Sequence, residues 1–242
     1  MRWIVAGLVI FAGGAGAGEV RVAVAANFLS TLQMLQPHYE KKSGDRLSIS
    51  AGASGSLYAQ IVQGAPFDLL LAADGHYPTL LEQAGRVERG SRFIYARGRL
   101  VLWSRQAGGI DRQRLRQYHG RLALANPRTA PYGRAARQVI DALDLGEQLS
   151  LIQGESVAQV FQFVASGNVP YGFVALAQVL NSRNRWNRDD YWLVPQQLYT
   201  PLDQEAALLS RAPNRRGALR FLRFIKSGEA REIIRANGYD LP

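Results

Sequence analysis

The chain has 242 residues, of which 47% are hydrophobic and 20% are charged. This composition is typical of one large or two ordinary globular domains, and it excludes disordered, collagen-like and coiled-coil proteins. The absence of cysteine excludes a disulfide scaffold, a zinc–cysteine site, an iron–sulfur cluster and a thiol nucleophile. The formal net charge is +10, and nearly all of the positive charge comes from arginine, because the chain has only three lysines.

Residues 1–18 have the pattern of a secretory signal peptide. Arg2 supplies a positive charge, Trp3 to Ala12 form an apolar run of ten residues, and Ala15-Gly16-Ala17 is a small-residue cleavage site. A membrane anchor is the alternative, but a spanning helix needs about 20 apolar residues. We therefore expect an exported, periplasmic protein that is cleaved after Ala17.

Short apolar runs alternate with amphipathic stretches in the first part of the mature chain. Strands are predicted at Val20–Ala25, Leu47–Ala51 and Asp68–Ala72. One helix is predicted after Asn27, as its N-cap, with a kink or break at Pro37, and another runs from the loop 52–56 through Val62. The alternation of strands and helices predicts a parallel sheet with right-handed crossovers.

A second α/β unit is predicted to begin near Arg99. Its expected strands are Leu100–Trp103, Leu122–Ala125 and Tyr171–Leu176. Helices are expected at Gly133–Leu143, Val157–Val164, Ala177–Leu180, Arg215–Ile225 and Glu229–Arg235, with an apolar stretch at Ala206–Leu209. No internal repeat and no low-complexity linker divides the two units.

Arginine is concentrated between residues 86 and 137. This window holds 13 arginines and two acids, Glu88 and Asp111, for a net charge of +11. Nucleic-acid binding, steering of anions and docking to an acidic partner are the functional interpretations, and a solvated surface is the alternative that we favour. The arginines are not interleaved with aromatic residues as in a stacking surface, and an exported protein seldom meets nucleic acid, so we expect no nucleic-acid partner.

Four loops are predicted at the carboxyl ends of strands, where an open α/β sheet binds its ligands. They are Ala25–Phe28, Gly52–Ser56, Asn126–Gly133 and Gly154–Val157. Each offers backbone N–H groups, small residues and neutral side-chain donors, and the start of a helix carries about half a positive charge. Several such ends that converge would bind an oxyanion without formal charge. Singly, each loop is equally well explained by helix capping or loop packing.

Catalytic and metal-binding arrangements are not found in the sequence. Ser54 does not lie in a G-x-S-x-G motif, because residue 56 is serine. His38, His76 and His119 have no metal-ligand spacing, and there is no Walker or GxGxxG phosphate loop. We therefore expect neither an enzyme nor a cofactor.

Taken together, the four loops resemble those of the molybdate-binding proteins of ABC importers, the ModA family. The best-matching stretches are AANF at 25–28, SAGASGSLYAQIVQGAPFDLLLAAD at 50–74, ANPRTAPYG at 125–133, ESVAQ at 155–159 and GFVALAQV at 172–179. Within them, GAPFDLLLAAD is the most specific marker. The resemblance extends from about Val20 to Tyr239, and the order and spacing of the stretches agree as well.

The resemblance implies a type II periplasmic solute-binding fold. Two α/β lobes with parallel sheets would be joined by a hinge that the chain crosses twice, with 19–97 and 197–242 in lobe I and 98–196 in lobe II. The protein would capture molybdate or tungstate between the lobes through neutral hydrogen-bond donors. It would deliver the ion to an ABC permease in the inner membrane. We expect a monomer, because such receptors open and present both lobes.

The resemblance also implies the residues of the site. Asn27 matches the donor of the first loop and Ser54 that of the second, while Tyr132 and Val157 match positions that donate through the backbone N–H. Ala26 completes the first loop. The same residues would hold the oxyanion, and no other metal site is expected.

Two hydroxyl groups of the family are missing. Many members have a tyrosine at the position of Ala175, and members with asparagine in the first loop have threonine at the position of Ala26. A receptor of the same fold for sulfate, phosphate or a small organic anion therefore stays open as the alternative.

Overall fold

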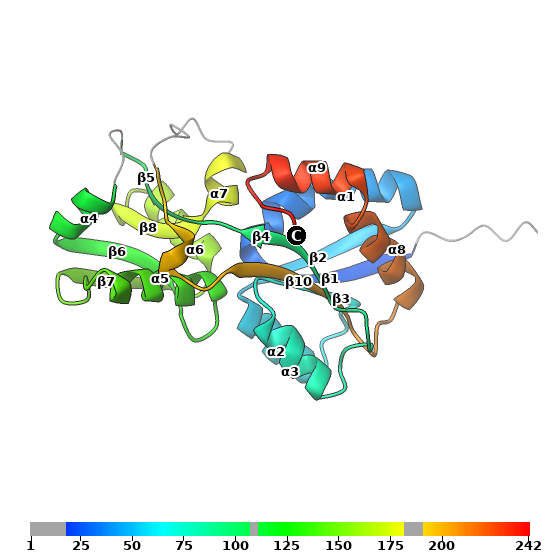
Figure 1. The fold of residues 1–242 in the computed structure, drawn as a ribbon. Helices are drawn as coiled ribbons and strands as arrows, with labels where there is room; N and C mark the ends of the chain where they lie inside the picture. The colour runs from blue at the N-terminus through cyan, green and yellow to red at the C-terminus, as the bar shows by residue number, and fades with distance from the viewer. Residues whose placement is uncertain (1–17, 107–110, 182–190) are drawn as a thin grey trace, which may run out of the picture.

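The computed structural model describes residues 18–106, 111–181 and 191–242. It forms two α/β lobes that lie side by side and are joined by extended chain segments (Figure 1). The predicted signal peptide lies outside the described residues, except for Gly18. Across the described part of the chain, every helix is too short or too polar to cross a membrane.

The first sheet has five strands in the order β2-β1-β3-β10-β4. Their bounds are β1 Glu19–Ala25, β2 Arg46–Gly52, β3 Leu69–Ala72, β4 Phe93–Gly98 and β10 Leu202–Leu208. Strand β1 pairs in parallel with β2 and β3, as the sequence predicts. Strand β10 is antiparallel to both β3 and β4.

The second sheet has the equivalent order, β7-β6-β8-β5-β9. Its strands are β5 Leu100–Ser104, β6 Gly120–Ala125, β7 Leu149–Gly154, β8 Tyr171–Ala175 and β9 Tyr191–Leu193. Strand β6 pairs in parallel with β7 and β8, whereas β5 is antiparallel to β8 and β9.

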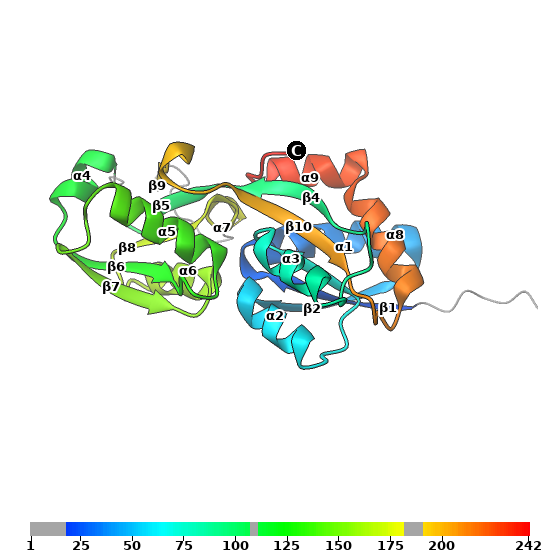
Figure 2. The same ribbon diagram turned by 60° about the horizontal axis from the view of Figure 1, so that its bottom comes forward.

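Three adjacent strands of each sheet are thus parallel, and one reversed strand makes each sheet mixed. The reversal follows from the chain crossing between lobes. The chain leaves the first sheet at the end of β4, at the junction between the lobes. Strand β5 therefore begins at this junction and runs away from it, antiparallel to β8. The same holds for β9 and β10 in the other direction, and β4 and β10 lie side by side at the junction (Figure 2).

Helices surround each sheet. Around the first sheet lie α1 Leu29–Ser43, α2 Ser54–Val62, α3 His76–Gln83, α8 Arg215–Ile225 and α9 Gly228–Ala236. Around the second lie α4 Arg112–Gln117, α5 Pro131–Ala142, α6 Val157–Ala165 and α7 Leu176–Asn181. Two short 3-10 turns complete the described elements, η1 Ala26–Phe28 and η2 Gln196–Leu198. Helix α1 continues through Pro37, so this proline does not split it.

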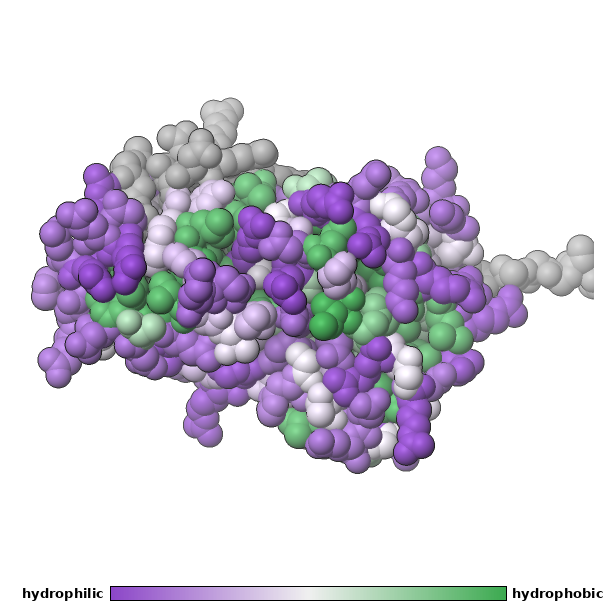
Figure 3. Space-filling view, viewed as in Figure 1, coloured by the Kyte–Doolittle hydropathy of each residue, from purple (hydrophilic) through white to green (hydrophobic). Residues whose placement is uncertain are grey.

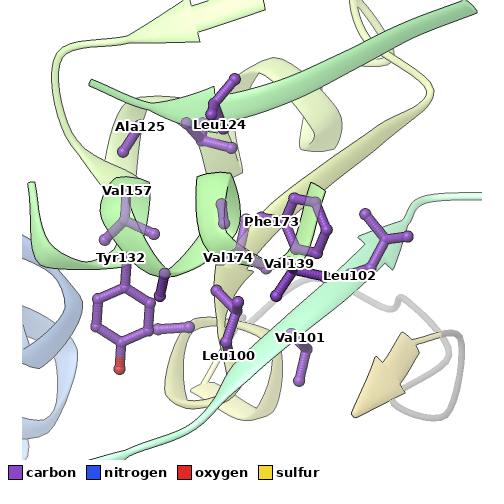
Figure 4. Packing of buried hydrophobic residues seen from close by; sticks show 14 of the residues in the cluster. Leu100, Val101, Leu102, Leu124, Ala125, Tyr132, Val139, Val157, Phe173 and Val174 are labelled. Carbon is purple, nitrogen blue, oxygen red and sulfur yellow. The ribbon is translucent and has the colours of Figure 1, made fainter. Parts of the chain in front are cut away.

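Each lobe has its own hydrophobic core. In the first lobe, Val22 and Val24 of β1 pack on the side of α1 and α8, while Ala23 packs on the opposite side near α2, as strand alternation requires. The second core fills the space between its sheet and α5 and α6 (Figure 4). There, the Trp103 ring stacks on Phe161 with ring centroids 4.8 Å apart. The C-terminal helices α8 and α9 pack on the first lobe against α1.

Candidate functional site

A small pocket lies where the carboxyl ends of strands from both lobes meet, and we call it the inner pocket. Its volume is about 10 Å³. It is lined by Ala25, Ala26, Asn27, Gly52, Ala53, Ser54, Ala73, Ala130, Pro131, Tyr132 and Val157. All five residues that the sequence singled out therefore line one pocket, although they come from four separate loops. Every lining side chain is uncharged.

Three helices begin at the inner pocket, and the first N–H groups of a helix have no partner within it. Helix α2 begins at Ser54, α5 at Pro131 and α6 at Val157. Because Pro131 has no N–H group, Tyr132 carries the first amide of α5. The Ser156 side chain caps α6 by accepting from the Gln159 N–H. The three helix starts therefore present amides and partial positive charge from both lobes.

The start of α5 depends on the glycine of the Pro-Tyr-Gly sequence. A Cβ atom on Gly133 would lie 2.2 Å from the carbonyl oxygen of Ala125, at the end of β6. Only a residue without a side chain lets the helix approach the strand this closely. Gly133 thereby holds the Tyr132 amide at the edge of the pocket.

Ser54 is the hydroxyl donor that the sequence predicted for the second loop. Its side chain is fully buried, and its Oγ atom accepts a hydrogen bond of 3.0 Å from the Ala73 N–H. A serine hydroxyl that accepts one bond keeps its own proton for another acceptor. The Ser54 hydroxyl can therefore donate to a ligand in the pocket without losing its structural bond.

Asn27 behaves differently from its predicted role as N-cap of α1. It lies within η1, and α1 has Phe28 at its N-cap without a side-chain bond. The Asn27 Nδ2 group donates to Gln204 Oε1 at 2.7 Å and to the Tyr239 hydroxyl at 3.1 Å. Both amide hydrogens are thus engaged within the protein, which leaves the backbone N–H of Asn27 as its donor toward a ligand. The cap prediction was wrong because tertiary partners outcompete the local one.

Gln204 is a structural partner of the pocket that sequence reasoning missed. It comes from β10 and is fully buried. Besides accepting from Asn27, it donates through Nε2 to the carbonyl oxygens of Leu202 at 2.8 Å and Ala73 at 3.3 Å. It therefore ties the first loop and the end of β3 to a strand at the lobe junction. The sequence carried no signal for it, because Gln204 lies between Asp203 and Glu205 in a polar stretch that does not look buried.

Ala175, where the family often has a tyrosine, does not line the inner pocket. It is buried at the end of β8, and its N–H donates to Gln178 Oε1 at 3.1 Å. The Gln178 Nε2 group in turn donates to the Val157 carbonyl oxygen at 3.3 Å. Gln178, on α7, thus joins the end of β8 to the start of α6.

A larger and more polar cavity, the outer groove, lies beside the inner pocket and has a volume of about 640 Å³. It is lined by Asp74, Gly75, His76, Tyr77, Ile94, Pro127, Arg128, Pro131, Arg134, Ala135, Gln138, Thr200, Pro201, Leu202, Asp203 and Glu205. Acidic side chains face it from the first lobe (Asp74, Asp203 and Glu205), and arginines face it from the second (Arg128 and Arg134).

Three contacts join the two lobes along the outer groove. Asp74 pairs with Arg134, and the Tyr77 hydroxyl donates to the Arg128 carbonyl oxygen at 3.0 Å. The backbone N–H of Gly55 donates to the Thr129 carbonyl oxygen at 2.9 Å. Burial raises the pKa of the Asp74 carboxyl, and the Arg134 charge offsets part of that rise.

The arginine-rich window does not form one uninterrupted basic surface. Five of its arginines pair with acids from outside the window, in the ion pairs Arg92–Glu205, Arg97–Asp203, Arg99–Asp240, Arg134–Asp74 and Arg137–Asp141. Hydrophilic residues gather over α4, where Arg112 and Arg116 are exposed (Figure 3). These pairs agree with the expectation of a solvated surface.

Metal coordination finds no support in the geometry. Within residues 18–106, 111–181 and 191–242, no group of three His, Asp or Glu side chains is arranged to hold a metal ion. The chemistry that the inner pocket offers is hydrogen-bond donation by neutral groups.

Comparison with known proteins places this geometry in a family. Residues 20–240 match the family described as bacterial extracellular solute-binding protein. A molybdate-binding protein ModA of Azotobacter vinelandii is 42% identical over 246 residues, which cover 99% of this chain and 97% of the relative. One of Rhodobacter capsulatus is 41% identical over 229 residues, covering 93% and 89%.

Solved structures agree with these sequence relatives. The Azotobacter vinelandii periplasmic molybdate-binding protein superposes with a TM-score of 0.85 at 38% identity, over 92% of this chain and 99% of that one. The sulfate-binding protein SubI of Mycobacterium tuberculosis shares the fold at 14% identity, with a TM-score of 0.76 over 92% of this chain and 86% of that one. These relatives are binding proteins, and the chain is not an enzyme. It belongs to the bacterial extracellular solute-binding proteins and, within them, to the ModA family.

Proposed function

We propose that the protein captures molybdate or tungstate in the inner pocket and delivers it to an ABC import permease. The observation that carries this proposal is the convergence of Asn27, Ser54, Tyr132 and Val157, with Ala26, on one buried pocket without a charged lining. The names of the two relatives above 40% identity support molybdate as the ligand. Export to the periplasm, directed by residues 1–18, belongs to the same proposal.

Neutral donors suit a receptor that must both bind and release an anion. Hydrogen bonds to a charged group contribute about 1.5–3 kcal/mol each in a dry site. An arginine in the same place would be a buried, unpaired charge whenever the ligand is absent, which is costly. The Ser54 hydroxyl and the amides of Tyr132 and Val157 avoid that cost because they carry no net charge.

The lobes would open and close about the two crossings of the chain. We propose the boundaries expected from the resemblance, with 19–97 and 197–242 in lobe I and 98–196 in lobe II. The sheet order supports them, because β4 and β10 belong to the first sheet while β5 and β9 belong to the second. The bound ligand would lie between the closed lobes. The protein would dock on the permease as a monomer with both lobes exposed.

Size would determine which oxyanions bind. Molybdate and tungstate have nearly the same dimensions, so little discrimination between them is expected. Sulfate is smaller, and in a closed pocket its oxygens would leave some donors unsatisfied, at about 1–3 kcal/mol each.

Thermal unfolding of residues 18–242 with molybdate, tungstate, sulfate or phosphate tests the proposal. Ligand at 100 times its dissociation constant stabilises by about 2.7 kcal/mol. For a chain of this size, that stabilisation raises the midpoint by about 5–11 °C. We expect this shift with molybdate and tungstate and little with the other two.

The same experiment tests the alternative ligand class. Because Ala26 and Ala175 replace hydroxyl-bearing residues, a receptor for another oxyanion or a small organic anion is the second candidate. A shift with sulfate or phosphate alone, or no shift with any of the four ions, would contradict the molybdate proposal and favour this one.

A further inference from the structure

The side chain of Tyr132 has a feature that its predicted role as a backbone donor does not explain. The residue comes from α5 in the second lobe, and only 2% of it is exposed. Its hydroxyl is buried, and in the described part of the chain no group meets it with hydrogen-bond geometry, although the Asn27 side chain lies near enough to offset part of the pKa rise that burial causes. Figure 4 shows the ring at the edge of the second core, with the hydroxyl pointing away from the other labelled side chains.

The hydroxyl fits a space that the glycine at the end of β4 leaves open. A Cβ atom on Gly98 would lie 2.1 Å from the Tyr132 hydroxyl oxygen and 3.1 Å from Cζ of the same ring. Gly98 does not have a positive φ angle. Its missing side chain, rather than its backbone conformation, is therefore what this position requires.

Gln204 borders the same space from the other crossing strand. The Gly98 Cβ position would lie 3.1 Å from Gln204 Nε2. Strands β4 and β10 pair here, with Gly98 opposite Leu202. Gln204 also holds Asn27 and the end of β3, so one amide connects the space over Gly98 to two loops of the inner pocket.

We propose that Gly98 and Gln204 form a seat for the Tyr132 hydroxyl that makes Tyr132 a positioning residue for closure of the inner pocket. The proposal rests on the function proposed above. The Tyr132 amide reaches the pocket from one end of the residue, and the hydroxyl fills the seat at the other. In this structure the hydroxyl is seated between the two crossing strands while the amide lies at the pocket, so the two ends of the residue are placed together.

The seat sets a threshold for closure. Seating strips the hydroxyl of water and gives it no partner, which disfavours the closed state. The ligand must offset this unfavourable contribution through its own hydrogen bonds. An empty receptor is thereby biased toward the open state, and the seat sharpens the difference between the empty and the loaded protein.

The seat predicts effects of opposite sign for two substitutions. Gly98→Ala places a methyl group where the hydroxyl sits, so the closed state is disfavoured and the dissociation constant for molybdate rises about tenfold or more. Tyr132→Phe removes the unpartnered hydroxyl, so closure is favoured and the dissociation constant falls about fivefold. A hydroxyl that donated to the ligand would give the reverse result for Tyr132→Phe. Combining both changes should restore much of the closure that Gly98→Ala loses.

Interlobe distances measure closure directly, and the chain's lack of cysteine makes labelling simple. Gln60 on α2 and Gln117 on α4 are exposed positions, one on each lobe, for cysteine substitution and a fluorescent donor–acceptor pair. Wild type, Gly98→Ala, Tyr132→Phe and the double variant would be compared with and without molybdate. Gly146→Ala is the matched control, because a Cβ atom there meets nothing within 4 Å.

We expect a shorter mean distance for Tyr132→Phe already without ligand, a longer one for Gly98→Ala with molybdate, and recovery in the double variant. Unchanged distances in both single variants, or lengthening in both, would overturn the seat. The ligand-free arm decides this even if molybdate does not bind wild type. That failure would refute the proposed function separately.

Discussion

The inner pocket and the outer groove are adjacent but are built from opposite kinds of residue. The inner pocket is lined by uncharged residues, whereas the outer groove has charged side chains from both lobes. The lining changes from uncharged to charged within one or two residues of the chain. Ala73 and Tyr132 line the inner pocket, whereas Asp74 and Arg134, which follow them closely, line the outer groove. Position relative to solvent, rather than position in sequence, separates the two.

Desolvation explains the difference. A group in the inner pocket must be stable both with and without an anion, and a neutral donor tolerates both states. In the outer groove, Arg134 keeps partial contact with water and pairs with Asp74, although burial still raises the pKa of the Asp74 carboxyl. The charged side chains therefore join the lobes at the outer groove, whereas the neutral groups of the inner pocket face the ligand.

The largest expected effect comes from placing a charge in the inner pocket. Ala53 is the N-cap of α2 and makes no side-chain cap bond, so aspartate or asparagine there would favour the helix. Two unit charges 4 Å apart interact by about 4 kcal/mol at an effective dielectric constant of 20. Ala53→Asp should therefore weaken molybdate binding by about a thousandfold or more, as measured by isothermal titration calorimetry.

Ala53→Asn is the matched control, because it has the same size and caps the helix without charge. Its binding should stay much closer to wild type. Equal losses in the two variants would show that side-chain volume, and not charge, is what the inner pocket excludes.

A smaller effect follows from removing one backbone donor. Val157 is the first residue of α6, where proline is tolerated, and Ser156 before it has the extended conformation that proline requires. Val157→Pro deletes one N–H group and should raise the dissociation constant about 10- to 150-fold. Val157→Ala keeps that N–H and serves as the control in the same titration. Wild-type affinity in the proline variant would remove Val157 from the site.

The smallest expected effect concerns Asp74 in the outer groove. Since burial raises the pKa of Asp74, folding favours its protonated form. The stability that this provides is present below the ordinary pKa of about 3.9 and is lost as the pH rises through the raised value. The free energy of unfolding of wild type, relative to Asp74→Asn, should therefore fall as the pH rises from about 4. Urea unfolding at a series of pH values measures it, and a rise instead of a fall would mean that the pair with Arg134 dominates.

Much of the architecture could be predicted from local pattern. The apolar runs of β1, β3, β6 and β8 are fully or nearly fully buried. A short continuous apolar run of this kind is recognisable in a sequence as a buried strand. Strands β4 and β7, at the edges of their sheets, escaped prediction. Neither strand is buried along its whole length: Ile94 in β4 is 39% exposed, and Ser150 and Gln153 interrupt the apolar residues of β7.

The sequence by itself determined the four loops, the order of the helix starts and, through the family resemblance, five of the eleven residues that line the inner pocket. Local amino-acid preferences suffice for these, because glycine, proline and small polar residues at strand ends restrict the backbone directly. Only the tertiary structure decided that the Asn27 side chain binds Gln204 and Tyr239, and that Gly98 makes room for Tyr132. These contacts join residues far apart in the chain, and their energies depend on burial that exists only in the folded protein: the Asn27 contacts need the first lobe to fold, and the fit of Tyr132 at Gly98 needs the lobes to meet.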